Sequence, residues 1–148
     1  MSIIKSVLIV DDNEDDQYIV SRTLLRSQTV EEKESIFTAD NGHEAIAFLS
    51  DFKAKQQVYG DKFPPTVILL DINMPIMDGF AFLEAYEEIT PNLAARSPIV
   101  LMLTSSENEK DIEKSKQFSC VKGYITKPLN KKKISSLLEI VNNNMPSG

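Results

Sequence analysis

The sequence predicts a doubly wound α/β fold in which helices cover both faces of a parallel five-stranded sheet. Three short runs of consecutive apolar residues each end at polar or acidic residues, and segments with helical spacing of apolar residues lie between them. Strands buried on both faces give such uninterrupted runs, and strands that alternate with helices form parallel sheets through right-handed crossovers. A chain of 148 residues has the length of one such domain. We therefore expect a single domain over residues 1–148, with a core at about 5–142 and a tail at 143–148.

Five segments are rich in β-branched and aliphatic residues, as strands are. The largely apolar runs span residues 7–10, 66–70, which opens with Thr66, and 99–103, and two runs of mixed composition span 35–39 and 123–126. Because a continuous apolar run indicates burial on both faces, we expect the first three in the centre of the sheet and the other two nearer its edges.

Five helices are expected to alternate with these strands. They span residues 14–27, 43–54, 79–89, 107–117 and 131–142. The first follows Asn13, a favourable N-cap, and has three acidic residues in its first turn. The fourth is mostly charged, with Ile112 as its main apolar residue, so we expect it to pack weakly against the sheet.

An extended loop is expected before the third strand, at about residues 51–65. The stretch contains Gln56-Gln57, Gly60 and Pro64-Pro65. Glycine and proline favour turns and loops, so this part of the chain is predicted to be irregular.

The composition excludes several classes of protein. With 16 Lys+Arg against 22 Asp+Glu the net charge is −6, which disfavours direct nucleic-acid binding. The longest apolar run, 99–103, is far shorter than the roughly 20 residues of a membrane-spanning helix, and the N-terminus lacks the features of a signal peptide. One cysteine cannot form an intramolecular disulfide. We expect a cytoplasmic protein without membrane contact.

Acidic and polar residues follow the predicted strands, at the edge where open parallel sheets bind ligands. Asp11 and Asp12 follow the first strand, Asp71 the third, Thr104 the fourth and Lys127 the fifth. Three adjacent carboxylates repel one another, and a hard divalent cation such as Mg²⁺ removes that conflict. A carboxylate nucleophile, a metal, a hydroxyl and a cation together are the components of phosphoryl transfer.

Each of these residues also has a plain structural explanation. An acidic pair after a strand is often a helix N-cap, a threonine before serines is often a turn, and a lysine before proline is often a solvated loop residue. The four signals stand at the predicted ends of four different strands, however, and this coincidence favours an acidic Mg²⁺ site.

The stretch Asp-Ile-Asn-Met-Pro-Ile-Met-Asp-Gly at residues 71–79 resembles the phosphoacceptor segment of two-component response regulator receiver domains. The other signature positions of that family are filled in order by Asp11-Asp12, Thr104-Ser105 and Lys127-Pro128. The resemblance covers residues 5–142 and implies a flavodoxin-like sheet with strand order 2-1-3-4-5. The lengthened segment at 51–65 is similar to that of the single-domain regulators that serve bacterial phytochrome-type histidine kinases.

The resemblance implies a phosphoacceptor and a metal site. Asp71 would accept a phosphoryl group from a phosphohistidine, carried by a sensor histidine kinase or a phosphotransfer protein, or from a small phosphodonor. Mg²⁺ would be held by Asp11, Asp12, Asp71 and the backbone carbonyl of Asn73.

The resemblance also implies a switch. Lys127 would pair with one phosphate oxygen and Thr104 would bond another, while Tyr124 matches the aromatic residue that swings inward as Thr104 moves. The alternative for Tyr124 is an ordinary strand aromatic with its hydroxyl at the surface. Asp78-Gly79 would be structural and set the turn into the third helix. The weakly packed helix at 107–117 is the candidate for the element that shifts.

The function predicted from the sequence is that of a stand-alone receiver, a phosphoacceptor switch rather than an enzyme. Its output would be a contact with a downstream protein, a phosphotransfer protein or a second copy of itself. A phosphatase with an aspartate nucleophile would need an acid two residues after Asp71, where this chain has Asn73. A flavin carrier would need a phosphate-binding loop where this chain has Asp11 and Asp12, and receivers that act without phosphorylation usually lack an acid or the lysine.

Three further features are given plain interpretations. His43 is expected at the surface of a helix, and Cys120 is expected to be a small buried apolar residue. The lysines at 131–133 open the last helix, where the helix dipole disfavours cations. They form either a solvated face, which we favour, or a docking patch for an acidic partner.

Overall fold

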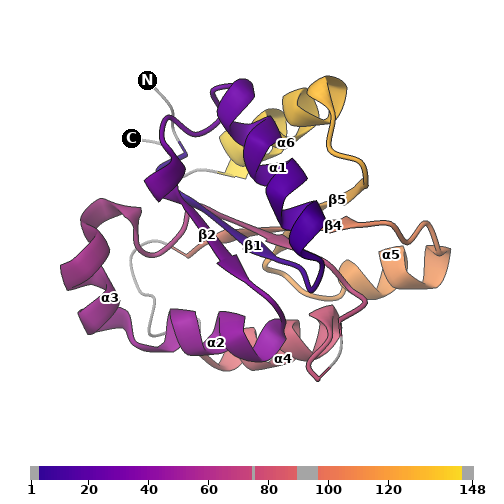
Figure 1. Cartoon of the computed structure of the whole chain (residues 1–148). Helices are drawn as coiled ribbons and strands as arrows, with labels where there is room; N and C mark the ends of the chain where they lie inside the picture. The colour runs from indigo at the N-terminus through magenta and orange to yellow at the C-terminus, as the bar shows by residue number, and fades with distance from the viewer. Residues whose placement is uncertain (1–3, 75, 90–96, 145–148) are drawn as a thin grey trace.

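The computed structural model describes residues 4–74, 76–89 and 97–144. Its centre is a parallel five-stranded sheet in the order β2-β1-β3-β4-β5 (Figure 1). The strands are β1 Val7–Val10, β2 Ile36–Ala39, β3 Val67–Leu70, β4 Ile99–Thr104 and β5 Val121–Thr126. The doubly wound fold and its strand order are thereby confirmed, and the two runs of mixed composition form the edge strands, as predicted.

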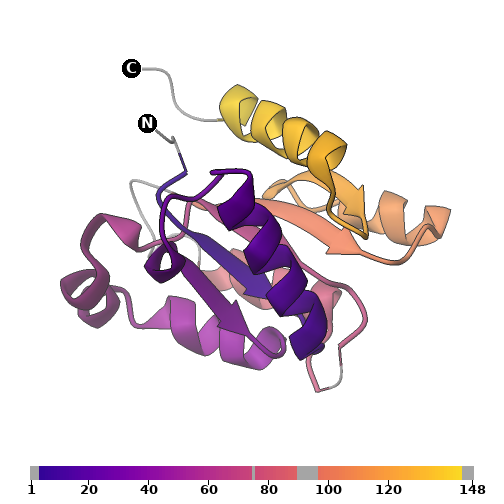
Figure 2. The ribbon, with the colours of Figure 1, turned by 45° about the horizontal axis from the view of Figure 1, so that its top comes forward.

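Helices cover both faces of the sheet. They are α1 Glu14–Arg26, α2 Gly42–Ser50, α3 Phe52–Tyr59, α4 Gly79–Ile89, α5 Glu109–Ser115 and α6 Lys131–Asn144, with short 3-10 turns η1 Lys33–Ser35 and η2 Gly60–Lys62. Figures 1 and 2 show α1 and α6 on one face and α2 and α4 on the other. In the described segments, no helix is both long enough and apolar enough to cross a membrane.

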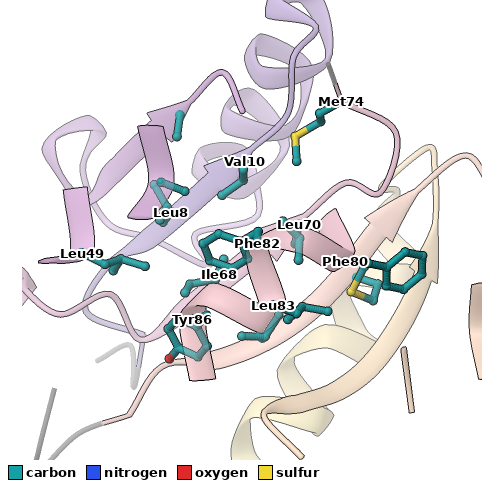
Figure 3. Packing of buried hydrophobic residues seen from close by; sticks show 14 of the residues in the cluster. Leu8, Val10, Leu49, Ile68, Leu70, Met74, Phe80, Phe82, Leu83 and Tyr86 are labelled. Atoms are coloured by element: carbon teal, nitrogen blue, oxygen red, sulfur yellow. The ribbon is translucent and has the colours of Figure 1, made fainter. Parts of the chain in front are cut away.

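The two faces of the sheet have separate apolar cores, because successive residues of a strand point to opposite sides. Leu8 and Val10 of β1 belong to the core under α2 and α4, and Val7 and Ile9 belong to the core under α1 and α6. Figure 3 shows the first core, where side chains of β1 and β3 meet four large residues of α4, which are Phe80, Phe82, Leu83 and Tyr86. All strand residues of β1, β3 and β4 are buried, which agrees with their continuous apolar sequence.

The predicted loop at 51–65 is wrong over most of its length, because Phe52–Tyr59 form α3 and Gly60–Lys62 form η2. The single helix predicted at 43–54 is likewise two helices, which are separated at Asp51. The chain therefore has one helix more than predicted among the described residues.

The apolar face of α3 is interrupted by a lysine, and this is why the sequence conceals it. Phe52, Lys55 and Tyr59 are the half-buried residues of this helix and lie on one side of it. The Lys55 ammonium lies 5.2 Å from the centre of the Phe48 ring, so a charged residue occupies a packing position. The Tyr59 ring packs against Phe37 of the edge strand at 4.8 Å between ring centres.

Both ends of α5 and the end of α6 differ from prediction by two residues, and α5 ends at Ser115 rather than at residue 117. The Asn108 side chain accepts a hydrogen bond from the backbone of Lys110, so α5 begins at Glu109 rather than at residue 107. The helix α6 continues through Asn144, so residues 143 and 144 of the expected tail are helical. The rest of that tail lies outside the described residues.

Candidate functional site

The sheet register brings the predicted acidic residues to one edge. Val10 of β1 is paired with Leu70 of β3, so Asp11 and Asp71 both stand immediately after the last residues of neighbouring strands. The Asp71 backbone N–H donates to the Val10 carbonyl at 3.0 Å, which continues the pairing one residue beyond the strand. The carboxyl ends of the central strands therefore carry the two carboxylates side by side.

Three carboxylates meet at this edge. Oxygen atoms of Asp11, Asp12 and Asp71 all lie within 4.8 Å of one another. Asp11 and Asp71 are buried, at 3% and 7% exposure, whereas Asp12 is exposed. The backbone N–H of Asn13 donates to Asp11 Oδ1 at 2.9 Å, and that of Ile72 donates to Asp71 Oδ1 at 2.8 Å. One oxygen of each buried carboxylate is thus held by the main chain, and the other contacts Lys127.

Lys127 is the cation of this cluster. Its Nζ lies 2.6 Å from Asp11 Oδ2, 2.9 Å from Asp16 Oδ2 and 3.3 Å from Asp71 Oδ2. The Lys127 backbone N–H donates to the Thr104 carbonyl at 2.9 Å, which fixes the start of the next loop to the end of β4. The peptide bond to Pro128 is cis. The predicted convergence of Asp11, Asp12, Asp71 and Lys127 is therefore present in the structure.

Burial and charge oppose each other at these groups. Burial raises the pKa of Asp11 above its ordinary value, although the hydrogen bonds from Lys127 and from the Asn13 backbone partly offset it. Burial alone would lower the pKa of Lys127, but hydrogen bonds to Asp11 and Asp16 and the charge of Asp71 outweigh it and raise the pKa. The lysine therefore stays protonated and partly neutralises the acidic cluster.

The donor set fits a hard divalent cation. Three carboxylates within 4.8 Å supply only oxygen ligands, and one of them is exposed to solvent. Mg²⁺ takes such ligands and keeps several waters, which a site open on one side allows. Asn73 is an exposed residue of the loop that follows Asp71, and the metal contact expected of its carbonyl stays a prediction.

Thr104 and Tyr124 converge on Ser106 of the β4–α5 loop. Thr104 is fully buried at the end of β4, and its Oγ1 accepts a hydrogen bond from the Ser106 backbone N–H at 3.3 Å. The Tyr124 hydroxyl donates to the Ser106 carbonyl at 2.8 Å. Burial raises the pKa of Tyr124, so its hydroxyl remains a donor. The two residues predicted to form the switch are thus joined to the same loop residue.

Two residues of the site were not predicted. Asp16, in the first turn of α1, contacts Lys127. Gln17, the next residue, donates to the Asp11 carbonyl at 2.6 Å and to Asp40 at 2.9 Å. In the sequence Asp16 is one of three acids in a first helical turn, a pattern that the helix dipole explains without any site. The spacing of residues along a helix could not have singled out Asp16 as a site residue, because Asp12 precedes the N-cap Asn13 and lies outside the helix.

The turn into α4 requires a glycine, in agreement with the structural role expected for Asp78-Gly79. A Cβ atom at Gly79 would lie 2.4 Å from the Asp71 carbonyl oxygen. The Gly79 N–H donates to the Ile72 carbonyl at 2.8 Å, and Asp78 Oδ1 accepts from the Ala81 N–H at 2.8 Å. The helix α4 therefore begins in direct contact with the backbone of Asp71.

Two response regulators are similar to this chain over most of its length. The response regulator Rcp1 of Synechocystis is 33% identical over 135 residues, which are 91% of this chain and 84% of the relative. The chemotaxis protein CheY of Halobacterium salinarum is 33% identical over 137 residues, which are 93% of this chain and 96% of the relative.

Solved structures give the same result. A two-component response regulator from Cytophaga hutchinsonii has a TM-score of 0.79 at 27% identity, covering 95% of this chain and 98% of that one. The phosphorylated cyanobacterial phytochrome response regulator RcpA has a TM-score of 0.63 at 32% identity, covering 94% and 89%. The Mn²⁺-bound form of Rcp1 has a TM-score of 0.63 at 31% identity, covering 94% and 90%. The family model of the response regulator receiver domain matches residues 7–139. The chain therefore belongs to the receiver domain family of two-component response regulators.

Proposed function

We propose that this receiver is a switch that accepts a phosphoryl group on Asp71 in a Mg²⁺-dependent reaction. The observation that carries the proposal is the position of Asp71, whose buried carboxylate lies against Asp11, Asp12 and the Lys127 ammonium at the edge of the sheet. A relative of known structure is phosphorylated and another binds Mn²⁺, which supports both parts of the proposal.

In the reaction, an oxygen of the Asp71 carboxylate attacks phosphorus and forms the acyl phosphate bond. The bond from phosphorus to the imidazole nitrogen of the phosphohistidine breaks, and its electron pair leaves with that nitrogen. Lys127 pairs with one phosphoryl oxygen, because its Nζ already lies 3.3 Å from Asp71 Oδ2. Asp11 and Asp12 would hold Mg²⁺. When bound, the ion would reduce the repulsion between the negatively charged carboxylates and phosphoryl oxygens.

The switch would then use the shared contact at Ser106. An acyl phosphate adds close to two negative charges beside Thr104, so its hydroxyl gains a strong acceptor in the phosphorylated state only. Movement of Thr104 toward that acceptor would pull on the Ser106 N–H and disturb the bond between the Ser106 carbonyl and Tyr124. We therefore expect phosphorylation to change the surface formed by α5 and Tyr124.

The partners proposed are a sensor histidine kinase or phosphotransfer protein as donor, and a downstream protein or a second copy as target. Large apolar side chains are exposed on segments that follow the acidic edge, namely Tyr18 at 65% and Ile19 at 51% on α1 and Ile76 at 89% in the loop between β3 and α4. Exposed apolar groups beside a charged site favour a protein contact. Receiver domains are phosphoacceptor switches rather than enzymes. The cytoplasmic location of this protein stays a prediction.

The proposal is tested by incubating the protein with Mg²⁺ and acetyl phosphate and measuring the intact mass. The wild type should gain one phosphoryl group, and Asp71→Asn should gain none. Asp12→Ala should lose the Mg²⁺-dependent labelling, because Asp12 is the exposed ligand of the three. A wild-type protein that stays unlabelled while a known receiver is labelled in parallel would contradict the proposal.

A further inference from the structure

Asp16 contacts Lys127 from outside the proposed metal site. Its Oδ2 lies 2.9 Å from Lys127 Nζ, closer than Asp71 Oδ2 at 3.3 Å. The side chain of Asp16 is 36% exposed and that of Lys127 is 15% exposed. Through its three ion pairs, the lysine therefore links α1 to the ends of β1 and β3.

The position of Asp16 is fixed by the start of its helix rather than by the carboxylate cluster. The Asp16 backbone N–H donates to the side chain of Asn13, the N-cap of α1, at 3.0 Å. The Gln17 side chain, next along the helix, bonds the Asp11 carbonyl. The first turn of α1 is thus attached to the main chain of the site, and the Asp16 carboxylate is held beside the ammonium.

An ammonium group has three N–H donors, and here three carboxylates accept them. A phosphoryl oxygen can pair with Lys127 only if one of these contacts is weakened. Of these three carboxylates, Asp11 and Asp71 would also bind the metal ion, and Asp71 would also accept the phosphoryl group. Asp16 takes no part in either, so its hold on the lysine opposes the transfer without contributing to it.

We propose that Asp16 is a positioning residue that holds the Lys127 ammonium toward α1 and so slows the phosphorylation of Asp71. This inference rests on the proposed function of Asp71. Removing the Asp16 charge should make the lysine available to the incoming phosphoryl group. For an ion pair of this exposure, the expected gain in the initial rate is about 2- to 5-fold.

The first experiment measures the initial rate of Asp71 labelling by acetyl phosphate at saturating Mg²⁺. Asp16→Asn should be faster than the wild type, and Asp16→Glu, which keeps the carboxylate, should restore the wild-type rate. Asp15→Asn is the matched control, because Asp15 is exposed on the same helical turn and none of the ion pairs among the described residues includes it. It removes the same charge without releasing the lysine.

The second experiment needs neither metal nor phosphorylation. In metal-free protein, the acetylation rate of Lys127 by N-hydroxysuccinimidyl acetate is measured by peptide mass spectrometry. The Asp16 carboxylate lies 2.9 Å from Lys127 Nζ and covers part of the ammonium, so Asp16→Asn should raise this rate while Asp15→Asn leaves it unchanged. The other exposed lysines of each variant serve as internal standards.

The outcomes separate the two proposals. Equal labelling rates for Asp16→Asn and the wild type, or equal acceleration by Asp15→Asn, would overturn the role of Asp16. If the wild type is not labelled at all, the function proposed for Asp71 fails, and the role of Asp16 in phosphorylation fails with it. In that case, faster acetylation in Asp16→Asn would still show that Asp16 restrains Lys127.

Discussion

Lys127 supplies the internal positive charge of the acidic edge. Its single ammonium contacts Asp11, Asp16 and Asp71, which without it would be adjacent carboxylates repelling one another. The Lys127 backbone is hydrogen-bonded to the Thr104 carbonyl at the end of β4, which fixes the point from which its side chain reaches the carboxylates. The charge balance of the site is therefore built from segments that lie far apart in the sequence.

The thiol of Cys120 should be unreactive at neutral pH. Burial raises its pKa to about 11, with a further contribution from Glu87. Because only the thiolate is nucleophilic, a rise from 9.0 to about 11 lowers the thiolate fraction at pH 8 by about 100-fold. Alkylation by iodoacetamide, followed by mass spectrometry, should be correspondingly slow and should accelerate as the pH is raised toward 11.

The reference for this measurement is the same protein unfolded in urea, in which Cys120 reacts as an ordinary thiol. Cys120→Ser provides the unlabelled background. Equal alkylation rates in the folded and unfolded protein at pH 8 would show that burial does not protect the thiol.

Tyr124 should report the state of the β4–α5 loop. Removing its hydroxyl in Tyr124→Phe deletes the bond to the Ser106 carbonyl and should lower the free energy of unfolding by about 0.5–1.5 kcal/mol. Labelling of Asp71 should persist. Amide hydrogen exchange at residues 105–108 should be faster in this variant before phosphorylation, and in the wild type only after it.

The control is Tyr18→Phe, since Tyr18 is 65% exposed on α1 and distant in sequence from this loop. It should leave the exchange of residues 105–108 unchanged. If phosphorylation does not alter exchange there in the wild type, Tyr124 has no part in a switch.

At the scale of elements, the contact between the start of α4 and Asp71 sets a strict limit on residue size. Alanine normally stabilises a helix relative to glycine, by about 0.5–1 kcal/mol. At Gly79 the added Cβ would lie 2.4 Å from the Asp71 carbonyl oxygen and 2.9 Å from the Ile72 Cα. Gly79→Ala should therefore lower the free energy of unfolding, by about 1–3 kcal/mol, and slow the labelling of Asp71.

Urea unfolding and the acetyl phosphate assay measure these two effects. Glu84→Ala, an exposed substitution on the same helix, should change neither by much. A Gly79→Ala protein as stable as the wild type would mean that α4 can move away from Asp71 at little cost.

The sequence predicted the sheet and most of the site because both depend on short, regular patterns. Strand burial follows from continuous apolar runs, and Asp11, Asp12 and Asp71 stand where parallel strands end. The position of Lys127 at the same edge of the sheet also follows from the strand order. These are consequences of topology and hardly depend on side-chain detail.

The parts that were missed depend on side-chain detail. The helix α3 packs through Phe52, Lys55 and Tyr59, and the lysine in this set hides the apolar spacing. The contact of Asp16 with Lys127 depends on the direction in which the first turn of α1 leaves β1, which no local pattern specifies. A polar residue with a packing or pairing role cannot be told from a solvated one by its type alone.

At the scale of the whole molecule, the fold should not need a metal ion. Lys127 already compensates the carboxylates in the structure described here, so treatment with EDTA should leave the protein folded. Mg²⁺ should then add stability by mass action, about 2.7 kcal/mol at 100 times its dissociation constant. For a protein of this size each kcal/mol raises Tm by about 2–4 °C or slightly more. Differential scanning fluorimetry across a Mg²⁺ titration measures the effect.

The matched variant is Asp12→Ala, which removes an exposed ligand and no buried one. Its Tm in EDTA should be close to that of the wild type, and its response to Mg²⁺ should be largely lost. An unchanged response would remove Asp12 from the metal site.

The helix α3 has a consequence for how the protein can be studied. It contains no buried residue, and it connects through η2 to the start of β3, whereas Asp71 follows the end of that strand. Figures 1 and 2 accordingly show α3 at the end of the sheet where the strands begin. Val58, 72% exposed on this helix, is a natural attachment point for a fluorophore or a surface tether. A molecule immobilised there would present its acidic edge to solution, open to phosphodonors and partners alike.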